Sequence, residues 1–163
     1  FCHNPVETDA ARRPANGSAG PAQTIDMKFL AHRVHGGEEL HNTYGTDYTV
    51  YGFGGNKTSF AEVRYPGGLN QCFMCHKDNS ESPNESSLTY SNVNTPQYPL
   101  NPTGPVTTAC YGCHDNTATL SHSLSFTTKL GEACTSCHSV NYEFSPTKMH
   151  ANEVKVEPGQ ASK

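Results

Sequence analysis

The cysteines constrain this chain more than any other feature, because six of the seven fall into pentads of the form Cys-x-x-Cys-His. The pentads occupy residues 72–76, 110–114 and 134–138. Two thiols separated by two residues can add to the two vinyl groups of a haem, and the adjacent imidazole can then reach the iron. The pattern predicts three covalently attached c-type haems. The thiols concerned are Cys72, Cys75, Cys110, Cys113, Cys134 and Cys137.

Two other uses of paired cysteines, a zinc site and a disulfide framework, fit this pattern less well. A structural zinc ion does not require a histidine at the same offset after every cysteine pair. A disulfide framework does not require one either. One pentad would leave zinc open, but three with the histidine at the same place favour haem.

The composition also indicates a bound group that fills the interior. Only 34% of the 163 residues are hydrophobic, there is no Trp, and the chain has 14 Gly and 11 Pro. Such a chain has few apolar side chains with which to offset its ordering entropy. We therefore predict a multihaem cytochrome c fold, with mostly loops and short α-helices packed around haems and little β-structure. The length fits a single domain over residues 1–154 and a flexible tail over 155–163.

The seventh cysteine, Cys2, is followed by His3 and has the form of the end of a fourth pentad. Its first cysteine would lie just before residue 1. We expect the chain, which opens on Phe1, to be a mature or truncated product. The prediction is then four haems, of which the fourth is attached through Cys2.

The nine histidines divide into two groups. Imidazole is the usual second axial ligand of a low-spin haem that transfers electrons, so the histidines outside the pentads are candidate distal ligands. The predicted proximal ligands are His3, His76, His114 and His138. The five that remain are His32, His35, His41, His122 and His150.

A helix over residues 24–36 is predicted to carry His32 and His35. Thr24 can cap its start, and the glycines at 36 and 37 can end it. Residues three apart lie on neighbouring faces of a helix, so the two imidazoles cannot readily approach one iron from opposite sides. They are predicted to bind two different haems.

The other three candidates differ in context. Ser145 followed by Pro146 is typical of a helix start, which places His150 in the second turn. We predict His150 and His122 to be distal ligands. His41 precedes a turn-like segment, and an exposed loop histidine is at least as well supported there as a ligand.

The rest of the chain predicts little regular structure. Residues 47–51 and 62–65 have strand character and flank a glycine-rich link, which suggests a small β-ribbon. Residues 4–23 are expected to form a surface loop. Residues 79–108 contain neither Cys nor His and are expected to wrap over haem edges.

Charge and hydropathy exclude some partners. The net charge is −4 and there is no run of Lys or Arg, which argues against nucleic acid. No apolar stretch approaches the roughly 20 residues that span a bilayer. The chain is therefore expected to contain no transmembrane segment.

Several longer motifs resemble one family. They are Cys-His-Asn-Pro at 2–5, His-x-x-His-Gly-Gly-Glu at 32–38, Asp-Tyr-Thr-Val-Tyr-Gly-Phe-Gly at 47–54, Tyr-Pro-Gly at 65–67, Gly-Glu-Ala-Cys-Thr-Ser-Cys-His at 131–138 and Lys-Met-His at 148–150. Together they resemble the pentahaem module of the decahaem outer-surface cytochromes of metal-reducing bacteria. The resemblance runs from Cys2 to His150.

This resemblance implies bis-His ligation of every haem, a closely spaced haem chain and a location outside the cytoplasm, at the outer cell surface, extracellular or periplasmic. It also implies that electrons pass to minerals, soluble metals, flavins or a partner cytochrome. By position, His32, His35, His122 and His150 match the distal ligands of the family, and His41 matches none. A complete module begins with a further pentad, so this chain is expected to lack the first haem and half of the second.

Three functions follow from these expectations. The favoured one is an electron carrier without a catalytic residue, in which every iron has two histidine ligands. A subunit of an extracellular haem filament is an alternative, and the sequence does not separate it from a monomer. A multihaem oxyanion reductase is less favoured, because it needs an iron with an empty distal position, and four distal candidates match the four haems.

Overall fold

Short helices joined by long irregular segments make up most of the chain, as a computed structural model shows for residues 3–83, 104–128 and 130–151. The longest described helices have nine residues. The α-helices are α1 (Met27–His35), α2 (Gly37–Tyr44), α3 (Pro105–Tyr111), α4 (Thr117–Ser125), α5 (Thr135–His138) and α6 (Pro146–His150). Single 3-10 turns are η1 (Ala10–Arg12), η2 (Phe53–Gly55) and η3 (Cys72–Met74). The predicted fold class, short helices with little β-structure, is confirmed.

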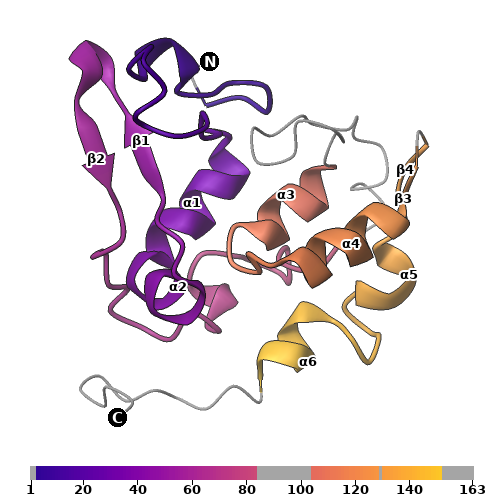
Figure 1. Cartoon of the computed structure of the whole chain (residues 1–163). Coiled ribbons are helices and arrows are strands. Elements are labelled where there is room, and N and C mark those ends of the chain that lie inside the picture. Colours follow the sequence, from indigo (N-terminus) through magenta and orange to yellow (C-terminus); the bar gives the residue numbers. More distant parts are fainter. Residues whose placement is uncertain (1–2, 84–103, 129, 152–163) are drawn as a thin grey trace.

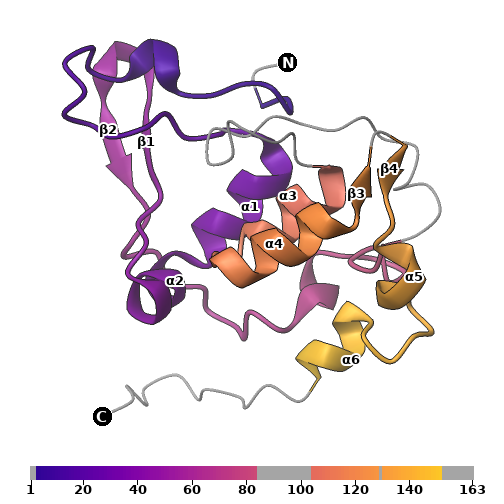
Figure 2. The ribbon, with the colours of Figure 1, turned by 45° about the vertical axis from the view of Figure 1, so that its right-hand side comes forward.

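Helices α1, α3 and α4 lie side by side in the middle of the molecule (Figures 1 and 2). The small apolar core lies here and joins Phe29 of α1, Tyr111 of α3 and Tyr48. The rings of Phe29 and Tyr48 meet edge to face, with centroids 5.7 Å apart. Two short β-ribbons lie at opposite ends of this group, as both views show.

Helix α1 begins at Met27, and its cap is Asp26. The Asp26 side chain accepts a hydrogen bond from the backbone N–H of Lys28 at 3.0 Å. The prediction that Thr24 caps the helix was wrong, because the Thr24 hydroxyl instead accepts from the N–H of Asp26 at 3.1 Å. Thr24 thus orients the capping residue.

Helix α2 follows α1 almost directly, and it contains His41. The expectation of an exposed loop histidine was wrong about the loop, although His41 is exposed. Gly37, the first residue of α2, packs against backbone: a Cβ at this position would lie 2.0 Å from the carbonyl oxygen of Phe60. Helix α2 ends at Gly45, whose φ of 65° is the left-handed conformation that favours glycine.

The predicted ribbon is present, but its second strand was placed wrongly. Strand β1 (Thr49–Tyr51) pairs antiparallel with β2 (Lys57–Ser59), not with residues 62–65. The residues of β2 are all exposed, so they lack the apolar pattern on which a strand prediction depends. Residues 60–63 instead turn back toward α2, where the Val63 carbonyl accepts from the N–H of Glu38. A second ribbon, β3 (Thr127–Thr128) with β4 (Gly131–Glu132), was not predicted.

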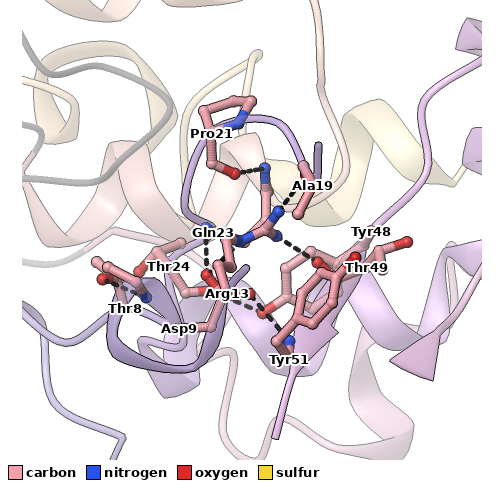
Figure 3. Close-up of polar contacts among 11 residues, drawn as sticks. Thr8, Asp9, Arg13, Ala19, Pro21, Gln23, Thr24, Tyr48, Thr49 and Tyr51 are labelled. Atoms are coloured by element: carbon pink, nitrogen blue, oxygen red, sulfur yellow. Dashed lines mark hydrogen bonds and ion pairs between the residues drawn. The ribbon is translucent and has the colours of Figure 1, made fainter. Parts of the chain in front are cut away.

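Residues 4–23 form more than a surface loop, because a buried ion pair attaches them to β1 (Figure 3). The Asp9 carboxylate accepts from Arg13 Nε at 2.7 Å, from the N–H of Gln23 at 2.8 Å and from the N–H of Tyr51 at 3.0 Å. The Arg13 guanidinium also donates to the carbonyl of Thr49 at 2.7 Å. Asp9 is 3% exposed, so these contacts replace its hydration.

Two further predictions concern the loop expected at 79–108 and the tail expected at 155–163. Residues 105–108, expected within a long loop, belong to α3. The ranges 84–103 and 155–163 lie outside the described residues. Within the described parts of the chain, the helices lack the combination of length and apolar character that a membrane span needs.

Glu132 holds the start of α3 against the segment that precedes the last pentad. Its carboxylate accepts from the N–H of Val106 at 2.9 Å, from the N–H of Thr107 at 2.8 Å and from the Thr107 hydroxyl at 2.5 Å. Glu132 is 2% exposed. Gly104 leaves room for it, since a Cβ there would lie 2.0 Å from the Glu132 carboxyl carbon.

We expect Glu132→Gln to lower the free energy of unfolding by about 1–3 kcal/mol, because an amide NH2 would face a backbone N–H and leave it without an acceptor. Chemical denaturation followed by circular dichroism measures this loss. Glu143→Gln is the control, since Glu143 is exposed. Equal stability of the two variants would contradict the assigned role of Glu132.

Candidate functional site

The three complete pentads adopt one and the same helical turn. In each, the backbone N–H of the histidine donates to the carbonyl of the first cysteine, at 2.8 Å in 72–76 and 2.9 Å in 110–114 and 134–138. The backbone N–H of the second cysteine donates to the same carbonyl at 3.1 to 3.2 Å. The turn brings two thiols and an imidazole to a common arrangement each time. No disulfide joins the six cysteines that the structure describes, and Cys2 lies outside the described residues.

Each of these pentads has a histidine from elsewhere in the chain opposite its own. The ring of His76 lies 6.0 Å from that of His32. The ring of His138 lies 6.1 Å from that of His122. The ring of His114 lies 5.8 Å from that of His150. The predicted distal histidines 32, 122 and 150 are thus each brought to one predicted proximal histidine.

These separations fit a metal ion between the rings. An imidazole nitrogen that binds a transition metal lies about 2 Å from the ion, and the ring centre lies about 1 Å further out. Two rings on opposite sides of one ion therefore have centres about 6 Å apart. The interplanar angles of 10°, 49° and 86° differ, as rotation about the axis through the metal permits.

Hydrogen bonds to backbone carbonyls orient three of these six rings in the same way. Nδ1 of His32, His138 and His150 lies 2.6 to 2.7 Å from a backbone carbonyl oxygen. A carbonyl only accepts, so Nδ1 carries the proton and Nε2 keeps the lone pair that a metal needs. Burial lowers the pKa of His32 below its ordinary value of 6.5. The hydrogen bond to the Lys28 carbonyl opposes this shift, and the nearby imidazoles add to it. The lowered pKa favours the neutral ring.

Three other histidines also have a hydrogen-bonded Nδ1, but no imidazole lies opposite them among the described residues. His3 Nδ1 lies 2.9 Å from the carbonyl of Ile25, and His35 Nδ1 lies 2.6 Å from that of Ala31. The ring of His35 packs edge-on against Tyr65, with centroids 5.4 Å apart. The third, His41, has its Nδ1 2.5 Å from the carboxylate of Asp47.

Large apolar side chains lie exposed around the imidazole pairs. Phe73 and Met74, inside the first complete pentad, are 72% and 61% exposed. Phe126 touches the ring of His122, with centroids 5.0 Å apart, and is itself exposed. Phe73 and Met74 are neighbours in the chain, and exposed apolar side chains that lie together usually indicate a surface that something else covers. The thiols, the imidazole pairs and these side chains together fit haem c.

Two contacts near the pairs could not be foreseen from the spacing of the motifs. Gly112, inside the second complete pentad, lies against α1: a Cβ there would be 2.7 Å from the Cβ of His32. Arg33 of α1 forms a buried ion pair with Asp115, which follows the same pentad. Gly112 and Arg33 occupy variable positions of the 110–114 pentad and of the motif at 32–38, so the spacing of these motifs does not indicate their contacts.

A comparison with family models supports this assignment. Residues 1–151 match the model described as outer membrane cytochrome MtrC/MtrF-like, domains II/IV. No curated protein and no solved structure matches the chain significantly. The family implies haem c, electron transfer and an association with the outer membrane. The match covers more than half of the chain, which therefore belongs to the outer membrane cytochrome MtrC/MtrF-like family and is a multihaem electron-transfer cytochrome.

Proposed function

We propose that this chain conducts electrons at the cell exterior through four haems, each of which has two histidine ligands. Haem supplies a one-electron redox centre when it is bound. The observation that carries the proposal is the separation of 5.8 to 6.1 Å between the rings of three histidine pairs. Each pair consists of one pentad histidine and one histidine from another segment.

We assign the pairs as follows. His32 is the distal ligand opposite His76, His150 is opposite His114, and His122 is opposite His138. The hydrogen bonds at Nδ1 of His32, His138 and His150 fix the orientation of these rings and leave Nε2 for the metal. His35 is then the distal ligand of the fourth iron, whose haem is attached through Cys2 with His3 as its proximal ligand.

Two histidine ligands leave no coordination position for a substrate. Electrons therefore leave by outer-sphere transfer, at a haem edge that solvent or a partner can approach. The proposed acceptors are extracellular metal ions, flavins and partner cytochromes. The residues of the chain bind the haems and adjust their potentials through burial and hydrogen bonds.

The assignment of His32 and His35 to different irons predicts different effects of His32→Met and His35→Met. A methionine ligand raises the potential of a haem. We expect His32→Met to raise the potential of the haem on residues 72–76, and His35→Met to leave that haem unchanged. Spectroelectrochemical titration of the haem-loaded chain measures both potentials.

His41→Met is the matched control, because His41 is also an exposed histidine on a helix with its Nδ1 hydrogen-bonded. It should leave every potential where it was. If His32→Met and His35→Met disturbed the same haem, the assignment of the two rings to different irons would be wrong.

The haem count gives a second prediction. Intact-mass spectrometry of the haem-loaded chain should show four covalent haems, and Cys2→Ala should show three, because Cys2 is the proposed attachment of the fourth. Val6→Ala is a control for a change near the same end of the chain and should keep four. Three haems in the unchanged chain would contradict the attachment through Cys2, and fewer than three would refute the whole proposal.

Full ligation predicts a low-spin spectrum. The oxidised chain should give low-spin electron paramagnetic resonance signals, and the reduced chain should pass electrons to a soluble ferric chelate or an oxidised flavin without binding carbon monoxide. A high-spin signal with carbon monoxide binding would instead favour a reductase that has one open iron. His122→Ala is the positive control, because it should open the iron opposite His138.

A further inference from the structure

A largely buried ion pair between Arg33 and Asp115 joins two segments that carry proposed haem ligands. Arg33 Nη2 lies 2.5 Å from Asp115 Oδ2, and the two side chains are 6% and 17% exposed. Arg33 directly follows His32, and Asp115 directly follows His114. Each charge is therefore one residue away from a proposed ligand of a different iron.

The surroundings keep this pair in place. The Arg33 guanidinium lies over the ring of Phe29, 5.9 Å from its centroid. Gly112 brings the backbone of the 110–114 pentad against α1, as a Cβ there would lie 2.7 Å from the Cβ of His32. Burial, followed by the Asp115 carboxylate, raises the pKa of the Tyr111 hydroxyl, so Tyr111 stays neutral beside the pair.

The charges of the pair are not fully compensated by hydrogen bonds. Arg33 Nη1 is buried and has no hydrogen-bond partner among the described residues. A cavity of about 240 Å³ lies beside the pair and is lined in part by Phe29, Thr46 and Asp47. A charge in such surroundings acts on its neighbours more strongly than it would in water, because the local dielectric constant is low.

From this arrangement we infer that Arg33 and Asp115 act as positioning residues for electron transfer. Together they set the reduction potentials of the haems on residues 72–76 and 110–114. The inference rests on the proposed ligand pairs. The pair joins the segment that holds the distal ligand of one iron to the segment that holds the proximal ligand of the next. A positive charge stabilises the reduced iron and a negative charge stabilises the oxidised iron, so the balance within the pair affects both potentials.

The direction in which the haem potentials shift separates this role from a merely structural one. Asp115→Asn leaves the cation unpaired and should raise the potentials of both haems. Arg33→Gln leaves the carboxylate unpaired and should lower them. The double variant should return both potentials toward the original values, and Arg33→Lys, which keeps the charge, should shift them least. Spectroelectrochemical titration measures the potentials, and His32→Met identifies the haem on residues 72–76.

Asp9→Asn is the matched control, because it also leaves a buried arginine, Arg13, without its carboxylate, but beside β1 instead of the pentads. It should leave these two potentials unchanged. Unchanged potentials in both single variants, or shifts of the same sign, would overturn the inference. If Arg33→Gln does not fold, the nearly isosteric Asp115→Asn decides alone, since an unchanged or lowered potential would overturn it.

The haem count and the spin state are recorded on the same samples. Four low-spin haems with unshifted potentials would contradict only the role of the ion pair. A wrong haem count or a high-spin iron in the unchanged chain would contradict the proposed function itself. The two failures therefore give different results.

Discussion

The opposition of imidazole rings in three histidine pairs is the contact on which the arrangement of this chain depends. Each proposed iron needs a second histidine whose ring centre is about 6 Å from the first. The pairs 32 with 76, 114 with 150 and 122 with 138 come from segments far apart in the sequence. Helices α1, α4 and α6 carry the partners, and their short lengths suffice because each presents one or two imidazoles and not a long apolar face.

Buried charged side chains hold the segments together, as an apolar core does in other domains. Asp9, Arg33 and Glu132 are each at most 5% exposed, and each contacts a segment distant in the sequence. Asp9 joins the first segment to β1, Arg33 joins α1 to the end of the 110–114 pentad, and Glu132 joins the last ribbon to α3. Burial of a charge is costly unless it is paired and hydrogen-bonded. These side chains therefore stabilise one arrangement of the segments specifically.

The small size of the apolar core also bears on function. Large apolar side chains such as Phe73 remain exposed beside the pentads, whereas Phe29, Tyr48 and Tyr111 form the small core between the helices. In the proposed holoprotein the haems cover the first kind of surface. Electron transfer then depends on how the chain holds its redox centres relative to one another and on the charges placed between them. The ion pair of Arg33 and Asp115 joins two of the segments that carry the proposed ligands.

Much of the site could be predicted from the sequence, because haem attachment needs its thiols and its histidine at fixed local spacing. The pentads, the helix with His32 and His35, and the helix start at Pro146 are local patterns of this kind. The errors arose where contacts between distant segments decide: Asp26 and not Thr24 caps α1, the exposed β2 replaces the strand predicted at 62–65, and His41 lies in α2. By itself, therefore, the sequence determined the kind of cofactor and the candidate ligands. Only the tertiary structure decided which distal histidine faces which pentad and where the buried charges lie, since both depend on contacts between residues far apart in the chain.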